Sequence, residues 1–102
     1  MFRGRNNIGW DILINKDEIR FVRKSEIKRY PLNKLKEIKD RQGHGVFGDI
    51  IFVFEGDDDF VLKTINNQFK RLDRFIDTSL TALGVKFKKE RRFIEFVFII
   101  GK

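Results

Sequence analysis

The feature that most limits the fold of this chain is the alternation of large apolar residues with other residues in several short stretches. In the first stretch, every second residue is large and apolar: Ile8, Trp10, Ile12 and Ile14. Successive side chains of a strand point to opposite faces, so this period of two predicts a strand with one buried face. Residues 49–55 are apolar at nearly every position, which predicts a central strand or one covered on both faces.

Other parts of the chain add further strands and one helix. We expect strands at residues 19–24, 26–30 and 60–65, and a last pair, at 85–87 and 93–100, joined by a charged turn at 88–92. Apolar residues of the segment 67–83 recur at helical spacing, and Gly84 is placed to end that helix. Residues 32–39 fit either a short amphipathic helix or an irregular strand with a bulge, and we favour the strand.

The order of these elements carries a resemblance to a known family. Its components are a strand at 10–14, a turn at 15–17, a strand at 19–24, the spacing Leu32-x-x-Leu35-x-x-Ile38, a glycine before the strand 48–55, and the helix at 67–83. Over about residues 10–80 the chain thereby resembles the bacterial pleckstrin-homology-like (PH-like) family. The resemblance implies a scaffold without catalysis that binds anionic membrane surfaces or protein partners.

We therefore predict one α+β domain over residues 1–102. Its centre is a strongly bent antiparallel β-sheet, either PH-like or a small β-barrel or sandwich. One long helix lies near residues 67–83, and a C-terminal β-hairpin follows it.

The formal net charge of +7 is unevenly distributed. Residues 1–41 hold 12 basic and 6 acidic groups, residues 42–83 hold 4 and 7, and residues 84–102 hold 6 and 2. Basic segments attract anionic partners, although Lys and Arg also serve simply to keep a small protein soluble. The candidate patch for an anionic partner comprises Arg20, Arg23, Lys24, Lys28, Arg29, Lys86, Lys88, Lys89, Arg91 and Arg92.

Residues with catalytic or metal-binding chemistry are scarce in this sequence. There is no cysteine and one histidine, His44, so thiolate nucleophiles and thiolate metal sites are excluded. The motif Gly43-x-Gly45-x-x-Gly48 precedes a predicted strand instead of a helix, and therefore lacks the context of a dinucleotide site. The aspartates at 57–59 fit a solvated turn, and every acidic residue is expected to keep an ordinary pKa. We predict no catalytic, cofactor-binding or metal-binding residues, and no enzyme activity.

The function expected from these features is binding. We expect a small basic module that binds a protein partner, including its own copy, or an anionic membrane surface. The alternative is a small nucleic-acid-binding protein of bacterial, viral or mobile-element origin. Most Phe residues occupy core-like alternate positions, so no platform for base stacking is evident. An exposed ring of Phe47, Phe87 or Phe93 beside the cations would remove that objection.

Two further expectations concern location and assembly. The missing cysteine and the missing apolar leader fit a cytoplasmic protein. The apolar run at 96–100 is far too short to span a bilayer. Because the last strand is apolar on both faces, it needs cover on both sides, and homo-oligomerisation is one way to supply it.

Overall fold

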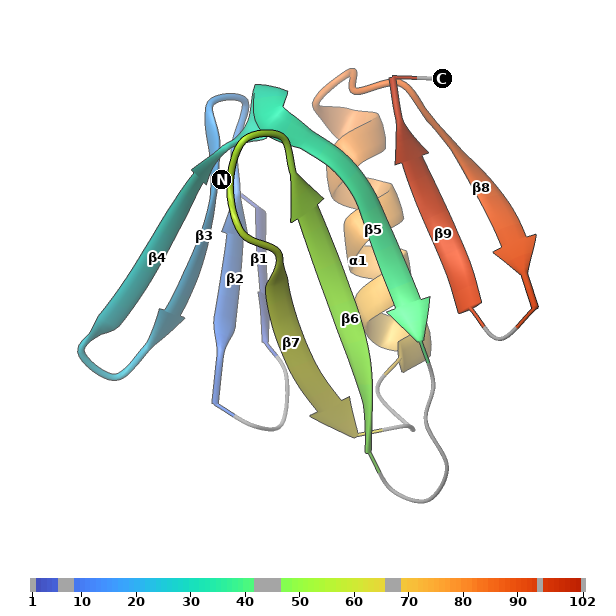
Figure 1. The fold of residues 1–102 in the computed structure, drawn as a ribbon. Coiled ribbons are helices and arrows are strands. Elements are labelled where there is room, and N and C mark those ends of the chain that lie inside the picture. Colours follow the sequence, from blue (N-terminus) through green and yellow to red (C-terminus); the bar gives the residue numbers. More distant parts are fainter. Residues whose placement is uncertain (1, 6–8, 42–46, 66–68, 94, 102) are drawn as a thin grey trace.

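The computed structural model describes residues 2–5, 9–41, 47–65, 69–93 and 95–101. These residues form nine strands in two antiparallel sheets, one 3-10 turn and one α-helix (Figure 1). Ile8, His44, the first two glycines of the Gly-x-Gly-x-x-Gly motif, and the first two residues of the predicted helix at 67–83 lie outside the described residues.

The two sheets follow one another along the chain. The first has the order β1-β2-β3-β4, with β1 at Phe2–Arg5, β2 at Asp11–Ile14, β3 at Glu18–Arg23 and β4 at Glu26–Pro31. The second has the order β7-β6-β5-β9-β8, with β5 at Leu35–Arg41, β6 at Phe47–Phe54, β7 at Phe60–Ile65, β8 at Phe87–Arg92 and β9 at Glu95–Ile100. The helix α1, Phe69–Ala82, follows β7 and lies behind the second sheet in Figure 1. The predicted α+β class, with its helix and C-terminal hairpin, is confirmed, and the described strands do not close into a barrel.

In the described part of the chain, one cluster of buried apolar residues joins both sheets and the helix. Phe21 of β3 stacks on Phe60 of β7 with ring centroids 3.8 Å apart. Phe21 also meets Phe52 of β6 edge-on, with centroids 4.9 Å apart. Aromatic contacts of this kind bury large areas, so a few rings join the two sheets across the core.

The predicted alternation is confirmed in β2 and β6. Trp10 just before β2 and Ile12 and Ile14 within it are buried. β6 is a central strand, paired with β5 and β7. Its residues Ile50, Phe52 and Phe54 are buried, whereas Ile51 and Val53 on the opposite face are only half-buried. The second sheet therefore has one face toward the core and one outer face turned to solvent.

The ambiguous segment at 32–39 contains a short turn followed by a strand. Leu32–Lys34 form a 3-10 turn, and β5 begins at Leu35. The pairing of β5 with β6 shifts register between Leu35 and Glu37. This bulge inserts one residue, so Leu35 and Ile38 both reach the core although three positions separate them. The prediction of an irregular strand is confirmed from Leu35 onward.

The predicted charged turn at 88–92 is wrong. These residues belong to β8, and the connection to β9 begins at Phe93. β8 is an edge strand of the second sheet, where charged side chains reach water from either face and discourage pairing with other chains. The last strand accordingly begins at Glu95 and not at residue 93.

The helix is confirmed over Phe69–Ala82, and residues 67 and 68 lie outside the described residues. It ends one residue earlier than residue 83, with Gly84 in the predicted role. Leu72, Ile76 and Leu80 form its buried stripe. Gly84 has a φ of +74° and its N–H donates to the carbonyl of Thr81, while the N–H of Val85 donates to the carbonyl of Leu80. This pair of bonds is the Schellman motif. Within the described residues, no helix is long and apolar enough to cross a membrane.

Candidate functional site

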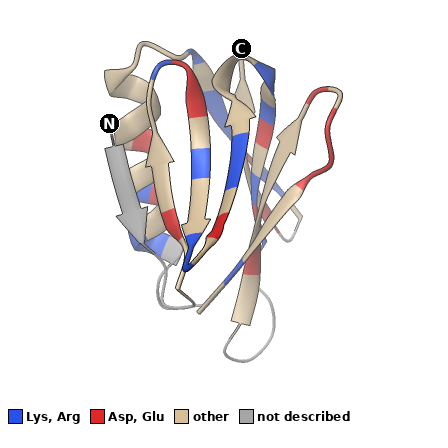
Figure 2. Ribbon diagram, turned by 90° about the vertical axis from the view of Figure 1, so that its left-hand side faces the viewer, with Lys and Arg blue, Asp and Glu red and all other residues tan. Residues whose placement is uncertain are grey.

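The ten candidate cations divide into two groups at opposite edges of the molecule. Five lie on or between β3 and β4, at the edge of the first sheet: Arg20, Arg23, Lys24, Lys28 and Arg29. The others lie on or just before β8, at the edge of the second sheet: Lys86, Lys88, Lys89, Arg91 and Arg92. β4 and β8 are at opposite sides of Figure 1, and acidic residues are interleaved with the basic ones in Figure 2. The two groups do not converge on one face.

In the group on the first sheet, two arginines already have local partners. Arg20 Nε lies 2.5 Å from a carboxylate oxygen of Glu18, and an Arg23 guanidinium nitrogen lies 2.9 Å from one of Glu26. The Arg23 guanidinium also lies 4.4 Å from the centre of the Trp10 ring. These contacts reduce the positive charge that the β3–β4 edge offers to an outside anion.

The group on β8 is split between the two faces of the second sheet. Lys88 and Arg92 lie on the outer face, opposite Ile99 and Glu95 of β9. Arg92 contacts the carboxylates of Glu37 and Glu90 at 3.3 and 3.4 Å. The outer face is nearly balanced in charge, so it is not a basic patch.

The inner face of β8 places its cations on aromatic rings. Lys89 is opposite Phe98 and Arg91 is opposite Phe96. The Arg91 guanidinium lies 5.0 Å from the centre of the Phe96 ring, and Lys89 Nζ lies 5.4 Å from that of Phe98. Lys89 also forms an ion pair with Asp77 of α1. Among the described residues, Arg91 and Lys88 form no ion pair.

The tip of the β8–β9 hairpin carries the most exposed large apolar side chain of the described residues. Phe93 is 98% exposed and directly follows Arg91 and Arg92. Only Phe93 and Ile94 separate the two strands, where Asn, Asp and Gly are the usual residues. An aromatic side chain left in water lacks the stabilisation of about 2 kcal/mol that its burial would give. A fully exposed ring at this position is therefore a candidate contact for a partner.

The expectation that phenylalanines belong to the interior is thus wrong at the hairpin tip. Phe47 is also half-exposed, at the end of β6 on the outer face. Phe87, by contrast, packs against the core. The sequence signal that was available for Phe93 is its place directly after the charged residues 88–92.

A second feature absent from the sequence-based prediction is a buried pair of carboxyl groups. Asp40 of β5 is only 3% exposed and faces Asp73 of α1. Burial is the largest cause that raises the pKa of Asp40, to about 9. The hydrogen bond that protonated Asp40 donates to Asp73 and the negative charge of Asp73 raise it further. The expectation of ordinary pKa values is therefore wrong here. The sequence signal was available in the alternation of β5. Asp40 stands two residues after the buried Ile38, so both side chains lie on the face toward the core.

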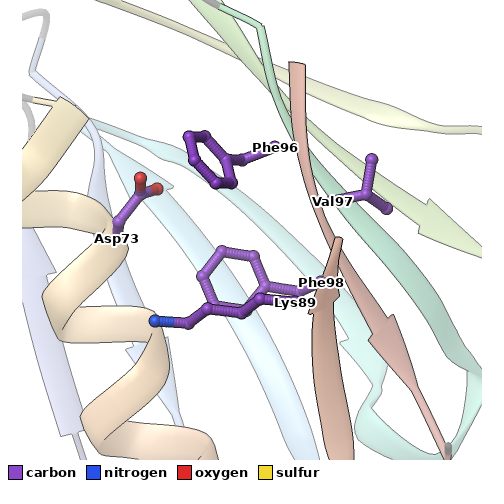
Figure 3. A pocket seen from close by; sticks show the side chains of 5 residues that line it. All are labelled: Asp73, Lys89, Phe96, Val97 and Phe98. Carbon is purple, nitrogen blue, oxygen red and sulfur yellow. The ribbon is translucent and has the colours of Figure 1, made fainter. Parts of the chain in front are cut away.

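A cavity of about 180 Å³ lies between α1 and the β8–β9 hairpin, next to this carboxyl pair. Its lining residues are Asp73, Lys89, Phe96, Val97 and Phe98 (Figure 3). The Phe96 ring and the Asp73 carboxylate point toward each other across it, whereas the Val97 side chain points away from α1.

Comparison with known proteins finds no matching family model, no similar curated protein and no matching solved structure. The resemblance to the PH-like family therefore stays a prediction.

Proposed function

We propose that this protein is a non-enzymatic module that docks on anionic membrane surfaces through the tip of the β8–β9 hairpin. The observation that supports this function most directly is the Phe93 ring, 98% exposed beyond the last residues of a basic strand. A ring in this position can enter the headgroup region without any rearrangement of the backbone. The cations of β8 then face the lipid phosphates.

The energetics favour weak and reversible binding. Burial of one Phe side chain contributes about 2 kcal/mol, and each Lys or Arg near an anionic surface contributes about 1 kcal/mol. Lys88 and Arg91 are the cations of β8 without an ion pair among the described residues. One apolar insertion and a few cations give the two signals that peripheral binding requires. Binding should therefore depend on anionic lipid and weaken with salt.

A second candidate function, binding of single-stranded nucleic acid, is favoured by Phe96. This ring is 43% exposed and lies near Phe93 in sequence, so the hairpin offers two rings beside cations. The membrane surface ranks first for two reasons. One face of Phe96 already carries the Arg91 guanidinium. The other tip residue is Ile94, whose aliphatic side chain does not stack on bases.

Flotation with lipid vesicles tests the proposal. The full chain is mixed with vesicles of phosphatidylcholine alone or with added phosphatidylserine, at low and at high salt. We expect flotation only with the anionic vesicles at low salt. Phe93→Ala should reduce the affinity for the anionic vesicles about tenfold, which corresponds to 1.4 kcal/mol. Phe47→Ala removes another exposed ring, outside the hairpin, and should bind as the natural chain does.

The proposal is overturned if the chain does not float with anionic vesicles at low salt, or if Phe93→Ala floats equally well. A gel shift with a single-stranded oligonucleotide separates the second candidate. A shift that Phe93→Ala abolishes, without flotation, would put nucleic-acid binding in its place.

Self-association and a cytoplasmic location stay predictions. The apolar β9 residue Val97 is already fully buried within a single chain, so this strand does not need a second subunit to cover it there.

A further inference from the structure

The cavity between α1 and the β8–β9 hairpin combines an apolar wall with an acidic one. The rings of Phe96 and Phe98 form the wall on β9, and the Asp73 carboxylate faces them from the helix (Figure 3). Its volume of about 180 Å³ exceeds the ~150 Å³ of an apolar cavity that accepts a benzene-sized molecule. The size and the chemistry of the walls therefore suit a small molecule with an apolar body.

Behind Asp73, the buried Asp40 adds a second carboxyl group. Within the described residues, one carboxylate oxygen of each aspartate, Oδ1, is buried without a hydrogen-bond partner. Burial and the neighbouring Asp73 raise the pKa of Asp40 to about 9, so Asp40 keeps its proton at neutral pH. The two Oδ1 atoms remain unused acceptors.

The neighbouring charges leave this acceptor site open. Lys89 also lines the cavity, but its ammonium group pairs with Asp77, one helical turn beyond Asp73. The Arg91 guanidinium lies on the Phe96 ring. No group of three or more His, Cys, Asp or Glu side chains in the described residues is arranged to hold a metal ion. Two carboxyl groups with an aromatic wall match an organic ammonium ion better than a hard metal cation, which takes six or more oxygen ligands.

We propose that this cavity binds a small primary amine with an aromatic or alkyl body. The ammonium group donates hydrogen bonds to the carboxylate of Asp73, and the apolar body packs against Phe96 and Phe98. This site is separate from the hairpin tip and does not depend on the membrane function.

The probes are benzylamine and benzyl alcohol, which have nearly the same shape and differ in charge. Amide chemical shifts of the full chain are followed by NMR during each titration. We expect shifts centred on Asp73, Lys89 and Phe96–Phe98, a dissociation constant for benzylamine on the order of millimolar, and at least about tenfold weaker binding of benzyl alcohol. Equal binding of the two probes would overturn the proposal, because an apolar hole alone explains it. Shifts located elsewhere, or no binding of benzylamine, would overturn it as well.

Variants then identify which charged group the ammonium of benzylamine contacts. Asp73→Asn should abolish the preference for the amine, and Asp59→Asn, the same change in the exposed β6–β7 turn, should leave it unchanged. If Asp73→Asn does not fold, the comparison of benzylamine with benzyl alcohol on the natural chain still tests whether the cavity prefers an amine.

Discussion

The carboxyl group of Asp40 on β5 is hydrogen-bonded to that of Asp73 on α1, inside the layer between the helix and the second sheet. Burial and this neighbour raise the pKa of Asp40 from 3.8 to about 9. Between these two values the folded protein holds a proton that the unfolded chain has lost. By linkage, the contribution of Asp40 to stability is fully present below about pH 4 and is lost as the pH rises toward 9.

The first prediction follows from this loss of stability with rising pH. Asp40→Asn removes the ionisable group but keeps an amide that donates to Asp73. The variant should match the natural chain near pH 4 and exceed its free energy of unfolding by about 1–2 kcal/mol at pH 8. Urea unfolding across this pH range measures the difference. A constant difference between the two proteins at all pH values would contradict the raised pKa of Asp40.

A second prediction compares two phenylalanines of β6. Phe52 is fully buried between the sheets, whereas Phe47 on the outer face is 51% exposed. Phe52→Ala should reduce the free energy of unfolding by about 3–5 kcal/mol, and Phe47→Ala by less than about 1 kcal/mol. The emission of Trp10, the single tryptophan of the chain, reports the transition because its ring is buried against Phe60. Similar losses of unfolding free energy for both variants would contradict the conclusion that the Phe52 face of β6 lies in the core.

A third prediction concerns the end of α1. Gly84 adopts a φ of +74°, which disfavours a residue with a Cβ, although no atom would contact that Cβ within 4 Å. Gly84→Ala should cost about 1 kcal/mol through backbone strain alone. Gly84→Asn should cost less, because asparagine tolerates this conformation better. Thermal denaturation of the three proteins tests the order, and equal stability of Gly84→Ala and the natural chain would rule out the Schellman ending.

A fourth prediction uses two ion pairs of like chemistry and unlike burial. Arg41 on β5 pairs with Glu95 on β9 at 2.9 Å, and the Glu95 side chain is only 11% exposed. Arg23 and Glu26, in the β3–β4 hairpin, are 38% and 51% exposed. Double-mutant cycles should give a coupling of about 1 kcal/mol for the first pair and less than about 0.5 kcal/mol for the second. A larger coupling for the hairpin pair would contradict the different burial of these carboxylates.

Much of the fold could be predicted because period-two and helical patterns are local properties of a sequence. The alternation around Ile12, the run at Phe52 and the glycine at 84 each have a structural meaning that neighbouring residues determine. Even the unusual spacing of Leu35 and Ile38 was open to prediction, since a bulge is one of the few ways to bring both inward.

The rest could not be predicted because it depends on which strands become neighbours. The charged residues 88–92 fit the composition of a turn. They can form a strand because they lie at the edge of the second sheet, where charged side chains reach water. Asp40 has an ordinary sequence context, and its altered pKa arises first from burial in the folded protein and then from Asp73, more than thirty residues further along the chain. The separation of the two basic groups likewise follows from the order of strands and not from their spacing in sequence.

The position of β5 between β6 and β9 has a consequence for how the chain folds during synthesis. Glu37 is paired with Ile99, so the neighbour of β5 on that side is synthesised after every other described strand. Until residues 95–100 have left the ribosome, β5 presents an open row of backbone donors and acceptors. We therefore expect the nascent protein to be open to strand exchange until the β8–β9 hairpin pairs with β5.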